Sequence, residues 1–428
     1  MSAPLLPRCA PEAVVARRPA PVDAEALALA APIVEQVLRE GLDALRRHAE
    51  RFDELCDGRL LLERSDLLAA LEAIEPARRS LLERSARRIE TFARRQRSWI
   101  RAGELNFAGG AAGQQIAPVQ RAGGYAPGGR YPLPSSVLMT AVTARAAGVD
   151  EVWIASPRPT PLVLAAAAIA GADGLLAAGG AHAVAALAGG AGKLPACDVV
   201  VGPGNRFVTA AKKIVSGMVG IDTLAGPSEL TVLADADARP RWVAADLLAQ
   251  AEHDPLARPV LIALDAGLEA AVQRELLEQV TTLPTAAVAR RALGGGLSVI
   301  AGDLEQAVAL CDRLAPEHLA LHLEDAETVA PRLAHYGALF IGGGAAEVLG
   351  DYGAGPNHTL PTGGAARYTG GLSVLDFLRV RTWLRIDDPG AAREILADAE
   401  ALAEAEGLSA HARSARLRRE GSGGPRPR

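Results

Sequence analysis

The sequence predicts an α/β protein built from two parallel β-sheet layers covered by helices. From Gly123 onward, short apolar runs rich in Val, Ile and Leu alternate with alanine-rich stretches of helical character. Continuous apolar strands separated by helices are typical of parallel sheets that are buried on both faces. Seven such runs are expected as strands: 150–156, 196–202, 229–235, 259–265, 297–303, 319–325 and 337–343. Their number indicates two such layers in tandem.

The first hundred residues are predicted to form helices. Between residues 22 and 101, apolar side chains recur at steps of three and four residues, which is the spacing of one helix face. The clearest series runs through Val34, Leu38, Leu42 and Leu45. In the stretch 78–101, apolar residues and glutamates separate the many arginines. This pattern favours an exposed amphipathic helix over a patch that binds a polyanion.

The most apolar stretch, residues 162–190, is predicted to be a buried part of the α/β layer and not a membrane span. It is rich in alanine, and glycines at Gly171, Gly174 and Gly179 divide it into a helix, a strand, a turn and a second helix. The N-terminal segment 1–20 lacks the sustained apolar run of a signal peptide, so we expect it to be an extension.

Composition and charge argue against two classes of partner. The chain has 428 residues and a mass of 44.3 kDa. A net charge of −5 and a pI near 6.0 do not suit binding to nucleic acid or to an anionic membrane. Aromatic residues make up only 4% of the chain, which also disfavours a surface for base stacking. We therefore expect neither nucleic acid nor a membrane as partner.

The four cysteines indicate a reduced, cytoplasmic protein. Cys9, Cys56, Cys197 and Cys311 form no CxxC pair and show no spacing typical of a disulfide framework. None of them lies in the polar segments that carry the candidate site residues, so a cysteine nucleophile is disfavoured.

Four short polar segments contain four of the eight histidines: 250–254, 316–318, 350–358 and 406–411. Gln250 and His253 lie near the predicted end of a helix that Pro255 should stop, so both are expected on one helix face. Asp351 and His358 enclose a stretch dense in glycine and proline, which is typical of a loop that carries polar groups into a cleft.

Glu317 and His318 are adjacent after a proline and form a carboxylate and imidazole pair suited to proton transfer near neutral pH. Zinc is usually bound by Cys, His and carboxylate groups, and a glutamine amide oxygen is a less common ligand. Spacing and residue type alone therefore indicate His253, Asp351 and one further histidine as metal ligands.

Several long motifs make the chain resemble the histidinol dehydrogenase family, the zinc- and NAD-dependent enzymes of the last steps of histidine biosynthesis. The resemblance covers nearly the whole chain, and the motifs occur in the family's order. They are YAPGGRYPLPSSVLM from Tyr125, VGPGNRFVTAAK from Val201, IDTLAGPSE from Ile221, LLAQAEHD from Leu247, APEHL from Ala315, GDYGAGPNHTLPTGG from Gly350 and AEGLSAH from Ala405.

The resemblance implies two incomplete Rossmann-like domains, a helical N-terminal segment and a helical C-terminal arm in an intertwined homodimer. A discontinuous α/β domain, 21–124 plus 228–372, would carry most of the zinc ligands and catalytic residues. An inserted Rossmann-like domain, 125–227, would carry the NAD contacts. The dimer arm would span 373–428 and end in a disordered tail.

The resemblance also assigns a metal site and a substrate site. One Zn²⁺ per subunit would be held by Gln250, His253, Asp351 and His411, with His411 donated by the partner subunit. The substrate L-histidinol would contact these four residues and also Ser228, His318, His358 and Glu406. Its imidazole and amine would occupy the remaining metal positions, so the metal would act mainly as a template that orients the substrate.

The implied reaction removes two hydride equivalents from one carbon, first from the alcohol and then from the hydrated aldehyde, and consumes two NAD. His318 is the expected general base in both steps, because an imidazole titrates near neutral pH. Glu317 is expected to activate the water that adds to the aldehyde. His358 would add a further contact to the substrate or to the intermediate.

The resemblance assigns the NAD contacts to Tyr125, His182 and Asn205. The glycine-containing loops around Tyr125 and Asn205 suit close approach to a pyrophosphate, and each also suits an ordinary tight turn. The family usually has glutamine where this chain has His182. One neutral imidazole nitrogen cannot both donate and accept as an amide does, so we expect altered NAD affinity and a new pH dependence.

Three other functions are compatible with parts of the sequence. A zinc hydrolase would use His253, Asp351 and His411 for the metal and Glu317 as base, but would need neither glycine-containing loop. A paralogous dehydrogenase of another amino alcohol or of a sulfonated diol would share the fold, although the EGLSAH segment favours the imidazole-bearing substrate. A non-enzymatic binding protein would leave the grouped acid and base residues unexplained.

Overall fold

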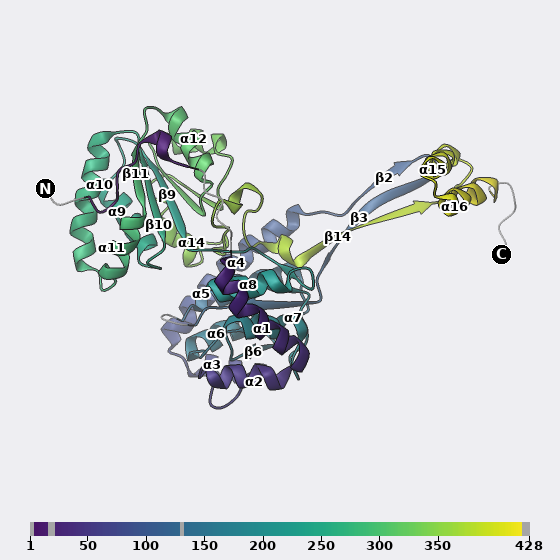
Figure 1. Cartoon of the computed structure of the whole chain (residues 1–428), viewed down its shortest axis with the longest axis horizontal. Coiled ribbons are helices and arrows are strands. Elements are labelled where there is room, and N and C mark those ends of the chain that lie inside the picture. Colours follow the sequence, from purple (N-terminus) through teal and green to yellow (C-terminus); the bar gives the residue numbers. More distant parts are fainter. Residues whose placement is uncertain (1–3, 16–21, 129–131, 422–428) are drawn as a thin grey trace. The chain divides into compact units, whose positions relative to one another are not determined.

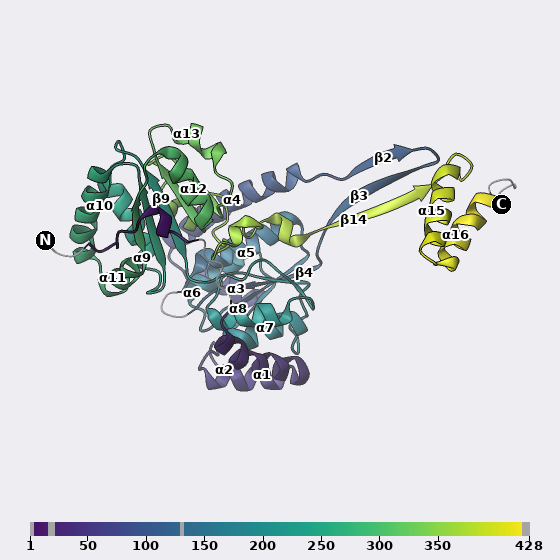
Figure 2. The same ribbon diagram turned by 45° about the horizontal axis from the view of Figure 1, so that its top comes forward.

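The computed structural model describes residues 4–15, 22–128 and 132–421, and the chain divides into two compact units. The first unit comprises residues up to 97 together with 119–377, and the second comprises 98–118 together with the residues from 378 onward. The first unit contains two mainly parallel sheets flanked by helices (Figure 1, Figure 2). The predicted α/β class with two sheet layers is therefore confirmed.

The first sheet has the strand order β1, β6, β5, β4, β7, β8. The strands are β1 (Leu61–Glu63), β6 (Gly174–Leu176), β5 (Glu151–Ala155), β4 (Arg121–Tyr125), β7 (Val199–Val201) and β8 (Gly220–Ile221). In this sheet β1 runs antiparallel to β6, and the other pairings are parallel. The order reverses between β4 and β7, so the carboxyl ends of these two strands flank the crevice where open α/β sheets bind ligands.

Helices cover both faces of the first sheet. Consecutive residues of a strand point to opposite faces, so two neighbouring residues of β4 show which helix lies on each face. A Cβ added to Gly123 would touch Leu187 of α7, whereas one added to Gly124 would touch Thr140 of α5. On the face of α7 (Gly180–Gly189), one apolar core is formed by α7 together with α1 (Ala24–Glu40), α2 (Leu42–Arg51) and α8 (Arg206–Val215). On the other face, α5 (Pro134–Ala147) contacts α6 (Pro161–Ile169), and α6 packs on α3 (Arg64–Ala73).

The apolar stretch 162–190 forms most of α6, then β6 and α7, as the sequence predicts. Its residues are largely buried in the first unit. Among the helices in the described part of the chain, none has both the length and the apolar character needed to cross a membrane.

The second sheet has five parallel strands in the order β11, β10, β9, β12, β13. They are β11 (Leu297–Ile300), β10 (Arg258–Ala263), β9 (Glu229–Ala234), β12 (His318–His322) and β13 (Ala338–Ile341). Leu261 packs with α9 (Pro240–Ala251), α10 (Ala266–Gln279) and α11 (Ala286–Gly295). The next residue, Ile262, packs with α12 (Leu304–Leu314) and α13 (Ala326–Val329). The chain visits this sheet in the same order as the parallel strands of the first, so both halves are Rossmann-like.

The N-terminal extension packs along the second sheet where the structure describes it. The Ser298 N–H of β11 donates to the Pro7 carbonyl at 2.8 Å, and the Cys9 N–H donates back to the Ser298 carbonyl at 2.8 Å. Leu6 is fully buried, and Arg8 forms an ion pair with the buried Glu269. Residues 4–9 therefore add a short strand-like segment to the edge of this sheet.

The domain assignment differs from the expected one at the N-terminal side. The resemblance implies that residues 21–124 belong with 228–372, whereas β1 pairs with β6 and α1 to α3 pack on the first sheet and its helices. These contacts join segments that lie far apart in the sequence, which no local pattern reveals. Within residues 21–124, helix α4 (Pro76–Trp99) does contact the 228–372 segment, because Arg88 Nε donates to the Gly353 carbonyl at 2.6 Å.

The second unit combines an antiparallel sheet with two helices. Strand β14 (Leu378–Ile386) pairs with β3 (Gly110–Pro118), which pairs with β2 (Gly103–Phe107). Helices α15 (Arg393–Ala405) and α16 (Ser409–Glu420) follow and pack on each other. The predicted helical arm is thus only partly helical, because β14 lies within it. The predicted disordered tail lies almost entirely in 422–428, outside the described residues.

Asp376 is expected to make the stability of the first unit depend on pH. It lies in the short 3₁₀ helix η5 (Val374–Phe377), and its carboxylate accepts the Ser373 N–H at 2.7 Å. Burial, with a contribution from the nearby Asp222, raises the pKa of Asp376 from 3.8 to about 6. A carboxyl whose pKa rises on folding destabilises the folded state above that pKa, and this penalty vanishes as the pH falls toward the unfolded value.

Asp376→Asn is therefore expected to raise the thermal unfolding midpoint relative to the parent chain at about pH 8, with a gain that shrinks steadily toward about pH 5. Thermal melts followed by circular dichroism at a series of pH values measure this. A difference between the two proteins that is the same at every pH would contradict the expectation.

Candidate active site

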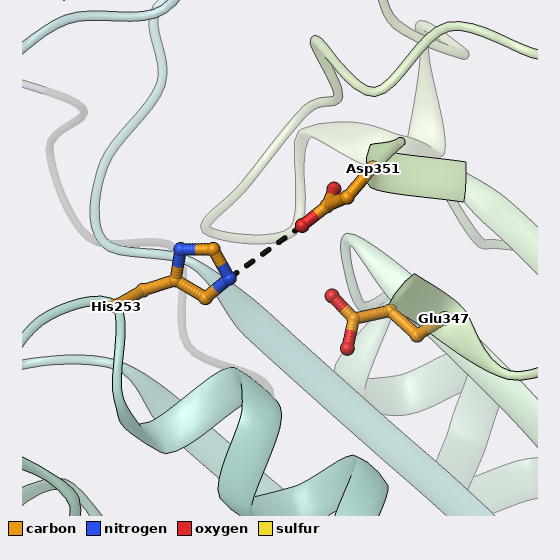
Figure 3. A group of neighbouring side chains, drawn as sticks. All are labelled: His253, Glu347 and Asp351. Atoms are coloured by element: carbon orange, nitrogen blue, oxygen red, sulfur yellow. Dashed lines mark ion pairs between the residues drawn. The ribbon is translucent and has the colours of Figure 1, made fainter. Parts of the chain in front are cut away.

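Three potential metal ligands converge where the short helix α14 (Glu347–Asp351) faces the turn after α9 (Figure 3). The donor atoms of His253, Glu347 and Asp351 all lie within 4.8 Å of one another. His253 Nε2 lies 3.5 Å from Asp351 Oδ2, and the three side chains point toward the same space. Because Glu347 and Asp351 are four residues apart, one helical turn presents both carboxylates on the same side.

Gln250 is a buried amide with unused hydrogen-bonding capacity. It lies in the last turn of α9 and is only 1% exposed. Within the described chain, neither its amide oxygen nor its amide nitrogen has a hydrogen-bond partner. Burying an unpaired amide costs about 1–3 kcal/mol, so a cation bound by the oxygen would remove part of this penalty.

His253 lies outside the helix that carries Gln250, which differs from the sequence prediction. Helix α9 ends at Ala251, and the His253 N–H donates to the Gln250 carbonyl at 3.4 Å in the turn that follows. The proline at 255 disfavours helical geometry in the preceding residues, so the helix stops earlier than expected. The turn, and not a shared helix face, brings the two residues near each other.

Glu317 and His318 lie at the amino edge of the second sheet, where His318 begins β12. His318 Nδ1 lies 3.0 Å from the Glu229 carbonyl oxygen, at the start of β9. A carbonyl can only accept, so Nδ1 carries the proton and Nε2 keeps its lone pair. Nε2 lies 3.9 Å from Glu347 Oε1, so the basic nitrogen faces the metal-ligand group. Glu229 also orients Glu317, because Glu317 Oε2 accepts the Glu229 N–H at 2.8 Å.

Burial shifts the proton affinities of these groups. It raises the pKa of Glu317 well above its usual value and, together with Asp351, raises the pKa of Glu347 to about 8. Burial lowers the pKa of His318 to about 4, so the imidazole is neutral and able to accept a proton at neutral pH. Several buried carboxyl groups thus share a small volume, and a cation among them would favour their ionised forms.

The residues after α14 connect this group to the first half of the unit. His358 Nδ1 donates to the Asp351 carbonyl at 2.9 Å, which leaves Nε2 3.4 Å from Ser136 Oγ in the first turn of α5. The neighbouring Asn357 amide donates to the Met139 carbonyl of α5 at 2.9 Å. The predicted loop therefore docks on the helix that follows β4, and the metal-ligand group lies close to the amino end of α5.

Sequence reasoning missed three residues of this cluster: Ser136, Glu229 and Glu347. Glu347 had a usable signal, because EVLGD places two carboxylates four residues apart directly before the glycine-rich stretch. Ser136 and Glu229 act through contacts with residues 222 and 89 positions away in the sequence. No local pattern marks such contacts.

The expected cofactor residues lie at the carboxyl edge of the first sheet. Tyr125 ends β4, is 3% exposed, and its hydroxyl accepts the Gly180 N–H at 3.1 Å. Asn205 caps α8, with Oδ1 accepting the N–H groups of Phe207 and Val208 at 3.0 and 3.2 Å. Its Nδ2 donors are not used by the cap. These residues flank the crevice between β4 and β7.

His182 lies in the first turn of α7 but is turned into the protein. It is 2% exposed, and its Nε2 lies 2.7 Å from Glu54 Oε2. Its ring stacks against His48 and Phe52, each at a centroid distance of 5.6 Å. Glu54 Oε2 also accepts the Gly179 N–H at 3.0 Å. The side chain thus contacts Glu54 and is linked through it to the start of α7.

The remaining expected residues fall in two places. Ser228 is half-buried and directly precedes β9, at the same sheet edge as Glu317 and His318. Glu406 and His411 belong to the second unit, where Glu406 caps α15 and His411 lies in the first turn of α16. Both are exposed in the described chain.

The cysteines take no part in this cluster. All four are free thiols, and Cys197 and Cys311 are buried. Burial raises the pKa of the Cys197 thiol to about 12, which disfavours the nucleophilic thiolate.

A doubly wound half whose strand order reverses between β4 and β7, next to a half that carries a buried neutral imidazole and a carboxylate group, is the arrangement expected of a nicotinamide-dependent dehydrogenase. The comparisons with known proteins specify which one. The model of the family described as "Histidinol dehydrogenase" matches residues 16–419. The chain belongs to the histidinol dehydrogenase family.

Individual relatives agree with the family match. The chain is 48% identical over 396 residues to a histidinol dehydrogenase of Thermus thermophilus, covering 91% of this chain and 95% of that protein. It is 44% identical over 397 residues to one of Syntrophotalea carbinolica, covering 91% of each. The solved structure of histidinol dehydrogenase from Elizabethkingia anophelis superposes with a TM-score of 0.92 at 29% identity, covering 98% of this chain and 99% of that one. The chain is thus an NAD-dependent oxidoreductase of histidine biosynthesis, and the hydrolase and binding-protein alternatives are wrong.

Proposed function

We propose that this chain oxidises L-histidinol to L-histidine through L-histidinaldehyde at one site. The observation that carries the proposal is the orientation of His318, whose basic Nε2 faces the carboxylates of the metal-ligand group. The overall reaction converts the alcohol, one water and two NAD⁺ into the carboxylate, two NADH and three protons. A base at a fixed position is needed for each alcohol or hydrate proton that leaves before hydride departs.

Zn²⁺ fits the residues of the candidate metal site. Gln250, His253 and Asp351 would hold it, with His411 of the partner subunit as the fourth ligand. The unpaired Gln250 amide and the close group of His253, Glu347 and Asp351 support this set. A bound zinc ion would supply a positively charged template for the substrate's nitrogen atoms. Glu347 would balance its charge from the side that faces His318.

Two residues would move protons in both halves of the reaction. His318 would take the hydroxyl proton of the alcohol and then that of the aldehyde hydrate. Glu317, held by the Glu229 N–H, would accept the proton of the water that adds to the aldehyde. His358 and Ser228 would also contact the substrate. His358 lies next to Asp351, and Ser228 lies at the edge of the sheet where β9 and β12 begin.

The cofactor would bind in the crevice between β4 and β7, against Tyr125 and the turn that ends at Asn205. The Asn205 Nδ2 group, which the helix cap does not use, and the amino end of α8 would face its phosphate and ribose groups. The contact between His358 and Ser136 links this half to the metal-ligand group, which supports a substrate and a cofactor that bind near the same place.

A homodimer would complete each site with Glu406 and His411 from the partner subunit. Two features of the second unit support this. Both residues are exposed, and its sheet carries exposed apolar side chains, such as Leu105 at 71%, Val380 at 56% and Leu384 at 68%. Apolar groups gathered on a sheet in this way mark an interface with another chain. A cytoplasmic location is part of the proposal and is supported by the four free cysteines.

His182→Gln is expected to change mainly the Michaelis constant for NAD and to leave the zinc content intact. The substitution removes the imidazole that contacts Glu54, and the Glu54 carboxylate also accepts the Gly179 N–H at the start of α7. The Michaelis constants for NAD of the two proteins are compared at about pH 6 and at about pH 8. His335→Gln, far from these contacts in sequence, serves as the control. An unchanged constant at both pH values would make this expectation wrong.

The function is tested by NADH absorbance with purified, zinc-loaded protein, excess NAD and a limiting amount of L-histidinol. We expect two NADH per histidinol, lost after chelation and restored by zinc. One NADH per histidinol would mean that the aldehyde is released. No NADH from histidinol, with folded and zinc-loaded protein, would favour the paralogous dehydrogenase of another amino alcohol or a sulfonated diol.

A further inference from the structure

A buried ion pair lies directly behind the turn that ends β7. Lys212 of α8 pairs through Nζ with Asp222 Oδ1, and the two side chains are 2% and 0% exposed. Lys212 is one of three lysines in the sequence, and the other two, Lys193 and Lys213, are exposed. Moving two charges out of water costs several kcal/mol per ion, on the order of what their attraction returns, so stabilisation alone does not explain the pair.

Both members of the pair bind the same residue, Gly202, the first after β7. Lys212 Nζ donates to the Gly202 carbonyl at 3.0 Å, and Asp222 Oδ2 accepts the Gly202 N–H at 2.8 Å. Gly202 has a φ of 115°, and a Cβ there would lie 2.2 Å from the Tyr125 carbonyl oxygen. Gly202 is therefore fixed by two side chains and by the backbone of β4.

The turn that is fixed in this way runs from Gly202 to Asn205, directly after β7, where the strand order of the first sheet reverses. Tyr125 lies beside this turn, at the end of β4, the strand that pairs with β7. Lys212 lies seven residues after Asn205, two helical turns along the same side of α8, so it ties the body of the helix back to the turn before it. Asp222, after β8, ties the turn to the neighbouring strand.

We propose that Lys212 and Asp222 are positioning residues that hold the Gly202 to Asn205 turn at the place where the dinucleotide binds. This inference rests on the cofactor site proposed above. The pair does not reach the crevice, because both side chains are buried behind the turn, so it acts on the cofactor only through the backbone of Gly202 and the cap at Asn205.

The test replaces both charges by apolar side chains of similar volume, Lys212→Met with Asp222→Leu. Such replacement of a whole buried pair is often tolerated in stability. We expect the Michaelis constant for NAD and the NADH dissociation constant, from fluorescence titration, to rise about tenfold or more, because small misplacement of a binding group is costly. The value of kcat at saturating NAD, the Michaelis constant for histidinol and the zinc content should stay within about twofold.

Lys213→Met is the matched control, because it removes an exposed lysine from the next position of the same helix. If the double variant does not fold, Asp222→Asn keeps the side-chain shape while breaking the ion pair, and we expect a rise of about threefold or more in the same two constants. A folded variant with both constants within about twofold of the parent would overturn the proposal.

Gly202→Ala separates this proposal from the cofactor site itself, since its Cβ would displace the turn while both charged side chains of the ion pair are retained. A raised NADH dissociation constant in Gly202→Ala, with none in the ion-pair variants, would reject only the positioning role. No change in any of these variants would reject this crevice as the cofactor site.

Discussion

Replacing His318 by asparagine is expected to lower kcat by about 10²- to 10⁴-fold in both oxidation steps. The asparagine amide can still donate to the Glu229 carbonyl that now binds Nδ1, so the local structure has a substitute for that hydrogen bond. It has no basic atom in place of Nε2, so proton removal loses its acceptor. Steady-state NADH production from L-histidinol and, separately, from L-histidinaldehyde measures the two steps.

Zinc content and the thermal midpoint of His318→Asn should stay close to those of the parent chain, because His318 is not one of the proposed ligands. His335→Asn is the matched control, a half-buried histidine outside the cluster. If His318→Asn slowed only one of the two steps, the assignment of a single base to both would be wrong. Glu317→Gln gives the contrasting pattern, since it should slow oxidation of the aldehyde more than oxidation of the alcohol.

Gln250→Leu is expected to have opposite effects on the zinc-free and the zinc-loaded protein. In the zinc-free protein it removes a buried amide that has no hydrogen-bond partner among the described residues. The free energy of unfolding should therefore rise by about 1–3 kcal/mol, and the thermal midpoint should rise with it. In the zinc-loaded protein it removes a ligand, so zinc should be retained less well and NADH formation should fall by about tenfold or more. Differential scanning calorimetry with and without zinc, with metal content by mass spectrometry, measures both effects.

Gln273→Leu is the matched control, because Gln273 is also buried but its amide is fully used. It donates to the Leu6 carbonyl and to Glu269 and accepts the Leu6 N–H. This substitution should lower the midpoint equally with and without zinc, since it leaves the Leu6 backbone unpaired. A Gln250→Leu protein that binds zinc as tightly as the parent would remove Gln250 from the ligand set.

The sequence determined those parts of the site that depend on local order. His253, Asp351, Glu317 and His318 are recognisable because each stands in a short polar segment that contains a proline or glycine or lies next to one. The strand runs of both sheets are recognisable for a similar reason: buried parallel strands are continuous apolar stretches, and helices separate them.

The tertiary structure alone decided what lies between segments. It placed Glu54 on His182 across 128 positions and Glu229 beside His318 across 89. It also paired β3 with β14, although glycine-rich β3 has little strand character by itself; a Cβ at Gly113 would lie 2.6 Å from the Trp383 ring, so the pairing requires glycine there. Such contacts depend on how distant segments pack, and the free energy that selects them comes from burial and hydrogen bonds absent from either segment alone.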